Sequence, residues 1–173
     1  MIRIKLFIAC FIYIFLIPSL LNAFCFETAG DAYGINPHLL ESIAKTESNL
    51  KPTAINKNQN GSIDMGLMQI NSLWIKELGL DPERLISDPC YNVKAGARIL
   101  KSCINKYGYT WEAVGCYNAV THTKRVNYSW KVFNILYERK KKLTEEEVKS
   151  IEQKAKDITQ SLLFSVKDNA AIK

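Results

Sequence analysis

The chain has 173 residues and a formal net charge of +6, with 47% hydrophobic and 23% charged residues. Its basic and aromatic residues are not interleaved, so nothing indicates a nucleic-acid-binding protein. The mild basic bias suits an acidic polymer as a binding partner, although a solvated surface explains it equally well.

The first 23 residues have the three parts of a secretory signal peptide. Arg3 and Lys5 make the start basic, residues 6–21 are almost wholly apolar, and Ala23 ends the segment as a small residue. We predict cleavage after Ala23. The alternative is an uncleaved membrane anchor, because about 17 or more apolar residues can span a bilayer. The rest of the chain has a size that suits one domain with one core.

One of the five cysteines lies in the segment to be removed, and Cys25, Cys90, Cys103 and Cys116 remain. An even number in an exported chain suggests two disulfides. A helix predicted over residues 92–107 would hold Cys90 and Cys103 about 20 Å apart, whereas a disulfide needs Cα atoms within about 7 Å. We therefore favour the pairs Cys25–Cys90 and Cys103–Cys116. The alternative is that some of these thiols are buried and free.

Most of the remaining chain has helical periodicity. The first helix, over residues 26–33, is closed by Gly34, and a capping Asn36 followed by Pro37 begins the second. Residues 48–63 have no period, and we expect a loop or small β element around residues 54–66. Further helices are predicted over residues 70–78, 92–107, 110–119 and 128–137. The fold class is therefore mainly α, in a single domain over residues 24–138.

Residues 139–173 differ in composition and form a basic, amphipathic tail. Four basic residues come first, and Thr144 with Glu147 then makes a capping box that would begin an extra C-terminal helix. The apolar residues of this helix recur at heptad-like spacing, and they are Val148, Ile151, Ala155, Ile158 and Leu162. The tail is either a solvated helix or a helix that docks on a partner protein.

Glu47 is the first candidate for chemistry. It continues the apolar stripe of the helix that starts at Pro37, so its carboxyl group should face the core or a cleft wall. Burial there would raise its pKa and make it a usable general acid near neutral pH. The alternative is a helix-end acid paired with Lys45 or Lys51. Glu41 falls away from the stripe and should be solvated.

Asp64 lies 17 residues beyond Glu47, across the polar loop. Cleavage of a glycosidic bond needs a protonated acid at the leaving oxygen and a second charge near the sugar carbon that becomes cationic. Gln69 and Asn71 could hydrogen-bond sugar hydroxyls and acetamido groups. The alternative for Asp64 is a turn-capping residue.

Three ordered motifs carry a family resemblance over residues 25–137. Glu47-Ser48-Asn49 and the run NGSIDMGLMQINS, residues 60–72, resemble the core of the lysozyme-like superfamily. The run IAKTES, residues 43–48, resembles the lytic transglycosylase signature around its catalytic acid, and WEAVGCYNA, residues 111–119, resembles that family's third motif. Together they are similar to the small specialised transglycosylases that accompany secretion systems, pili and conjugation machines.

The resemblance implies a lysozyme-like fold, a periplasmic location and cleavage of the MurNAc–GlcNAc bond in peptidoglycan. Glu47 would act as acid and then as base, while the muramic acid's own 6-hydroxyl attacks the sugar cation and gives an anhydro-sugar. Asp64 would assist. The residues expected to contact the substrate or line the cleft are Ser48, Gly66, Leu67, Met68, Gln69, Asn71, Tyr117 and Asn118.

We expect no cofactor and no metal, because Leu67 occupies the last ligand position of a would-be calcium loop and the two histidines are isolated. Peptidoglycan glycan strands are the expected partner, with an apparatus protein bound by the tail as a further one, and the chain is expected to be a monomer. Val120 departs from the family, which usually has glycine there. Asp64 leaves open a hydrolytic muramidase, and a catalytically idle glycan-binding factor is the alternative from another class.

Overall fold

The computed structural model describes residues 24–170, with side chains described for residues 24–158, so the expected signal peptide lies outside the described residues. The helices in this range are α2 (Phe26–Tyr33), α3 (Pro37–Ser48), α4 (Ser72–Leu78), α5 (Pro82–Ser87), α6 (Pro89–Tyr107), α7 (Trp111–Asn118) and α8 (His122–Ala170). The strands are β1 (Ile55–Lys57), β2 (Ile63–Met65) and β3 (Ile70–Asn71). The mainly α class with a small β element is confirmed.

Local capping explains where the first helices begin and end. Gly34 closes α2 in the left-handed region at φ 63°, and the Asn36 side chain accepts a hydrogen bond from the backbone N–H of His38 at the start of α3. The Thr110 side chain caps α7 in the same way by accepting from Ala113. These boundaries are those that the sequence predicts.

The sheet is antiparallel in the order β1-β2-β3, and its register aligns Asn56 with Asp64 and Asp64 with Asn71. Several predicted boundaries are wrong. Ile70 and Asn71 form β3, and the helix starts only at Ser72. α6 begins at Pro89, before the predicted start at residue 92, and α8 begins at His122, before the predicted start at residue 128. Asp81 caps a further short helix, α5, which we did not predict.

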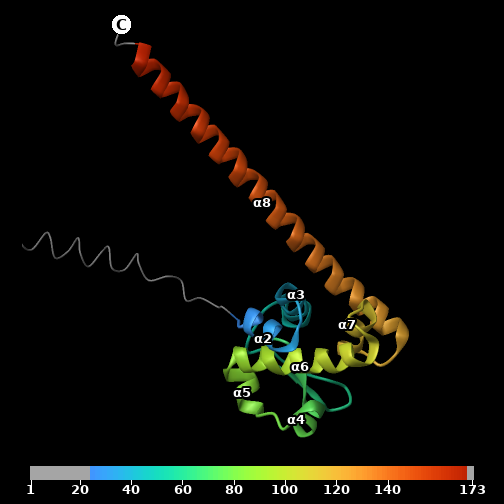
Figure 1. Ribbon diagram of the computed structural model, residues 1–173. Coiled ribbons are helices and arrows are strands. Elements are labelled where there is room, and N and C mark those ends of the chain that lie inside the picture. Colours follow the sequence, from blue (N-terminus) through green and yellow to red (C-terminus); the bar gives the residue numbers. More distant parts are fainter. Residues whose placement is uncertain (1–23, 171–173) are drawn as a thin grey trace, which may run out of the picture.

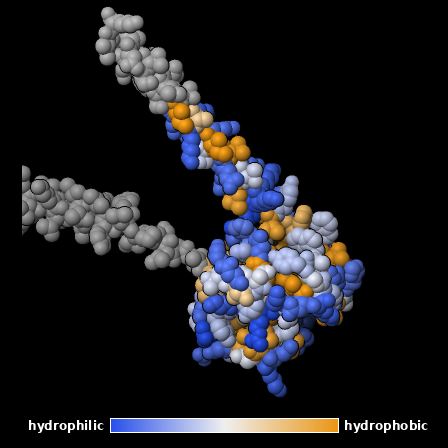
Figure 2. Space-filling view, in the orientation of Figure 1, coloured by the Kyte–Doolittle hydropathy of each residue, from blue (hydrophilic) through white to orange (hydrophobic). Residues whose placement is uncertain are grey.

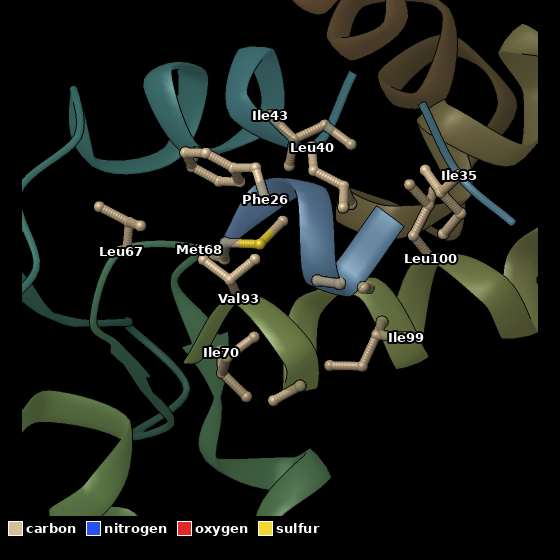
Figure 3. Close-up of a cluster of buried hydrophobic side chains, with 14 of the residues drawn as sticks. Phe26, Ile35, Leu40, Ile43, Leu67, Met68, Ile70, Val93, Ile99 and Leu100 are labelled. Atoms are coloured by element: carbon tan, nitrogen blue, oxygen red, sulfur yellow. The ribbon is translucent and has the colours of Figure 1, made fainter. Parts of the chain in front are cut away.

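The core lies around α6, which crosses the middle of the domain (Figure 1). Val93, Ala97 and Leu100 of α6 are fully buried. Figure 3 shows Val93 and Leu100 beside side chains from α2, α3 and the β2–β3 turn, among them Phe26 and Met68. The apolar stripe of α3 that ends at Glu47 is therefore packed on this core.

Both favoured disulfides are present. Cys25 and Cys90 have Cα atoms 5.3 Å apart and tie the start of α2 to the start of α6. Cys103 and Cys116 have Cα atoms 5.8 Å apart and tie α6 to α7 across the turn at Gly108. The two bridges fix α6 near both of its ends.

The last helix is longer than the sequence predicts. α8 runs without a break over 49 residues, roughly 70 Å, and its second half projects from the domain (Figures 1 and 2). No helix begins at Thr144, whose hydroxyl donates to the Lys140 carbonyl inside α8. Glu41 is not fully solvated as expected, because it forms an ion pair with Arg139 of α8. No helix within residues 24–170 is long and apolar enough to cross a membrane.

Candidate active site

A cleft of about 510 Å³ lies where α3, the sheet, α4 and α7 meet. Glu47 reaches it from the end of α3, Asp64 from β2 and Tyr117 from α7. The two carboxylates singled out in the sequence therefore share one cleft.

Glu47 has the environment of a general acid. Burial raises the pKa of its carboxyl group to about 7, and the negative charge of Asp64 adds to the rise. Two groups act in the opposite direction and lower the pKa: a hydrogen bond from Tyr128 and, more weakly, the positive charge of Lys131. Near neutral pH, a substantial fraction of Glu47 therefore carries a proton that it can donate.

Tyr128 is a site residue that the sequence did not reveal. It lies on α8, and its hydroxyl donates a 2.5 Å hydrogen bond to Oε1 of Glu47. Burial, and then the charge of Glu47, raises the pKa of Tyr128 well above its usual value, so the hydroxyl remains a donor. Oε2 of Glu47 is left as the oxygen that can carry the transferable proton.

Asp64 is fixed by two amide side chains. Asn58 donates to Oδ2 at 2.8 Å, and Asn71 donates to Oδ1 at 2.6 Å. The Oδ1 atom of Asn71 accepts from the backbone N–H of Leu73 and caps α4. Asn71 thus holds the second carboxylate in place, whereas we expected it to bind sugar. Asn58 was not predicted because its loop has no periodicity.

Gln69 lines the cleft, but its polar atoms are already engaged. Its Nε2 donates to the carbonyls of Ala54 and Gly66, and its Oε1 accepts from Asn56. The residue adopts a left-handed φ of 49°, which turns the chain tightly between β2 and β3. Its side chain therefore stabilises the turn that carries the cleft wall.

Four residues expected to contact substrate or line the cleft instead support it from behind. Leu67 and Met68 are fully buried in the core. Gly66 packs so closely that an added Cβ would lie 2.2 Å from both the Asn92 side chain and the Leu85 carbonyl. The Ser48 hydroxyl donates to the Leu67 carbonyl at 2.7 Å. None of these four residues lines the cleft, because they are used for packing and hydrogen bonding beneath it.

Tyr117 and Asn118, at the end of α7, both line the cleft. The Tyr117 hydroxyl donates to the Met68 carbonyl at 2.8 Å and so connects α7 to the β2–β3 turn. Burial, followed by the charges of Glu47 and Asp64, raises the pKa of Tyr117 well above its usual value, so this donor stays protonated.

The rest of the wall is more apolar and was not predicted. Leu73, Trp74 and Glu77 come from α4, and Val120 follows α7. Among the described residues, no group of three or more His, Cys, Asp or Glu side chains could hold a metal ion. The chemistry that this arrangement supports directly is proton transfer by Glu47 beside the fixed charge of Asp64.

Comparisons with known proteins agree with this arrangement. The profile of the family described as "Transglycosylase SLT domain" matches residues 24–131. Protein IpgF of Shigella flexneri is 42% identical over 132 residues, which cover 75% of this chain and 87% of that protein. Invasion protein IagB of Salmonella typhimurium is 43% identical over 122 residues, which cover 69% and 76% of the two chains.

A solved structure shares the fold. The lytic transglycosylase Slt of Pseudomonas aeruginosa, solved as an inactive mutant, superposes with a TM-score of 0.57 at 18% identity. The match covers 73% of this chain but only 25% of the larger protein. With the family match over residues 24–131 and relatives above 40% identity, the chain belongs to the transglycosylase SLT domain family and is a lytic transglycosylase.

Proposed function

We propose that this enzyme cleaves the MurNAc–GlcNAc bond of peptidoglycan glycan strands with Glu47 as both acid and base. The observation that carries the proposal is the half-buried Glu47 carboxyl group, whose pKa of about 7 lets it give up a proton and take one back near neutral pH. A carboxyl group with an ordinary pKa would be almost wholly ionised there and a poor donor.

The reaction has two steps. Oε2 of Glu47 gives its proton to the glycosidic oxygen, the bond from that oxygen to the muramic acid C1 breaks, and C1 becomes cationic. The Glu47 carboxylate then takes the proton of the muramic acid 6-hydroxyl while that oxygen bonds to C1, which closes an anhydro ring and restores the acid. In between, the hydrogen bond from Tyr128 stabilises the Glu47 carboxylate.

Asp64 supplies negative charge near the cationic sugar. Its two amide partners fix its position without neutralising it, which supports an electrostatic role. The same position keeps a second candidate open: Asp64 could activate a water that attacks C1, which would make the enzyme a hydrolytic muramidase. A third candidate, an idle glycan-binding factor, would bind strands without releasing products.

Mass spectrometry of digested sacculi separates these candidates. Anhydro-muropeptides are expected from the proposed reaction. Muropeptides with reducing ends would show hydrolysis by water, and binding without release by the folded protein would show the idle factor.

Replacing the acid tests the role of Glu47. Glu47→Gln keeps the shape of the side chain but removes the ionisable group, so we expect turnover of sacculi to fall about 10²-fold to 10⁴-fold. Asp64→Asn should cause a smaller loss. Glu27→Gln, at an exposed position on α2, is the matched control and should match the parent. If Glu47→Gln turned over sacculi at the parent rate, Glu47 could not be the catalytic acid.

We further propose that the enzyme is exported to the periplasm and opens the wall locally for a secretion, pilus or conjugation apparatus. The basic, apolar start of the chain supports export, and the name "Invasion protein IagB" of one relative is consistent with such a setting. The projecting half of α8 exposes Val148 and Ile151, which supports the tail, residues 139–173, as the contact to an apparatus protein.

A further inference from the structure

Val120 is an apolar residue in an unusual place. Its side chain is 87% exposed, yet it forms part of the wall of the catalytic cleft. Leu73, from α4, is 72% exposed and lines the same cleft. An aliphatic group in a cleft loses its contact with water when a ligand fills the cleft, which favours binding.

Arg125 holds the segment that carries Val120. Its Nε donates to the Ala119 carbonyl at 3.0 Å, and its Nη2 donates to the Val120 carbonyl at 2.6 Å. Its Nη1 donates to Glu112 at 2.7 Å, which fixes the guanidinium group from the other side. Only the planar, many-donor head group of arginine can make these three contacts at once.

Close packing adds to this constraint. An added Cβ on Gly115 of α7 would lie 2.6 Å from the Arg125 backbone oxygen, so α7 and the start of α8 are in direct contact. The Arg125 guanidinium group also lies 4.9 Å from the centre of the Tyr107 ring. The rim that carries Val120 is thus built before any substrate arrives.

We propose that Val120, held in place by Arg125, contacts the glycan strand and contributes to its binding. This inference rests on the proposed function. The group that Val120 contacts is an apolar part of an N-acetylated sugar, either the C–H face of the ring or the acetamido methyl group. The wall offers apolar surface for such a group from Leu73, Trp74 and Val120, while the polar Glu77 and Asn118 beside them can meet the hydroxyl and amide groups of the same sugar.

Such a contact should affect binding more than chemistry. It is made equally in the bound substrate and in the transition state, so its loss raises KM and leaves kcat unchanged. We expect Val120→Ser to raise KM on soluble, uncrosslinked glycan strands about fivefold to tenfold, the value of partly covering a valine-sized aliphatic group. Val126→Ser, the same change at a 38% exposed position that does not line the cleft, is the matched control and should leave both constants unchanged.

A double-mutant cycle tests Arg125 as the positioning residue. Arg125→Lys should raise KM to a similar extent, and it should add little in the Val120→Ser background, because both changes remove the same contact. Fully additive effects, or a fall in kcat with KM unchanged, would overturn this assignment. Thermal melting checks that the Arg125→Lys protein is folded. If that protein is unfolded, Val120→Ser alone tests whether Val120 contacts the substrate.

Binding by an inactive chain separates this inference from the proposed function. Glu47→Gln protein should sediment with purified sacculi, and adding Val120→Ser should weaken that binding about fivefold to tenfold. No binding by Glu47→Gln alone would contradict the proposed substrate. Equal binding with and without Val120→Ser would contradict the role of Val120 only.

Discussion

At the residue scale, the burial of Glu47 and its contact with Tyr128 together set the pH range of the enzyme. Glu47 is protonated below its pKa of about 7 and ionised above it, so kcat/KM should fall as the pH rises beyond 7. The hydrogen bond from Tyr128 lowers this pKa. Tyr128→Phe removes the donor, so the pKa of Glu47 should rise and the falling limb of the pH profile should move up by roughly one pH unit.

The matched control is Tyr137→Phe, an exposed position on the same helix. It removes the same hydroxyl group away from the cleft and should leave the pH profile unchanged. If the limb of Tyr128→Phe moved to lower pH instead, the hydroxyl could not be the group that stabilises the ionised form of Glu47.

The same pair shows which parts of the site the sequence can predict. Glu47 was predicted because a polar residue on an apolar stripe is visible within a single helix. Tyr128 is 81 residues further along, and only the packing of α8 on α3 brings the two together. Within its own helix, Tyr128 has the pattern of an ordinary packing residue. A hydrogen bond between distant helices leaves no periodic signal.

At the element scale, one buried amide connects the sheet to the helices. Asn92 of α6 is fully buried, and its Oδ1 accepts from the backbone N–H of Met68 at 2.7 Å. Its Nδ2 donates to the carbonyls of Met65 and Leu85. Asn92 therefore fixes the β2–β3 turn, whose Met68 carbonyl also receives the Tyr117 hydroxyl of the cleft.

Removing this amide should destabilise the domain. Asn92→Ala removes a hydrogen-bond partner from three backbone groups and opens a cavity, so we expect the free energy of unfolding to fall by about 3 kcal/mol. Equilibrium unfolding in urea measures this free energy. Asn105→Ala, at an exposed position on the same helix, should change it by less than about 0.5 kcal/mol. A similar small change for Asn92→Ala would show that the amide does not hold the turn.

Helices with strong local signals were predicted well from the sequence. Short elements held by tertiary contacts, such as the hydrogen bonds of Asn92, were not. α2 and α3 have clear caps, and α3 and α6 have long apolar stripes, although the start of α6 at Pro89 was missed. β3 and α5 have two and six residues, too few to show a period, and Asn92 holds the chain near both of them. The apolar motif at residues 66–68 indicated a cleft lining through its family resemblance, but its residues face the core because Asn92 and Ser48 bind their backbone.

At the scale of the whole molecule, α8 has two halves with different surroundings. The first half packs on α3 and α7 through the buried Tyr128 and Val132, and Arg139 pairs with Glu41 at the edge of the domain. From residue 140 to residue 158, every described side chain is exposed. Helical periodicity continues through both halves and does not reveal where the helix leaves the domain. We predicted the border between domain and tail from the basic run, and therefore placed it before Arg139. The ion pair places that residue in contact with the domain.

Shortening α8 tests where the domain ends. A chain that stops at Glu146 keeps every buried contact of α8 and the pair between Arg139 and Glu41, so its melting temperature should stay within about 2 °C of the parent's. Its turnover of purified sacculi should also be unchanged, because no residue of the removed segment lines the cleft and Tyr128, which contacts Glu47, is kept. A chain that stops at Tyr137 loses the ion pair and should melt several degrees lower, by roughly 4–8 °C for each kcal/mol lost. Equal melting temperatures of the two shortened chains would place the border of the domain before Arg139. A large loss of stability already in the chain that stops at Glu146 would mean that the projecting half supports the fold.

If only the chain that stops at Glu146 keeps both stability and turnover, then any function that it loses in cells belongs to the projecting half, as expected for a segment that binds an apparatus protein.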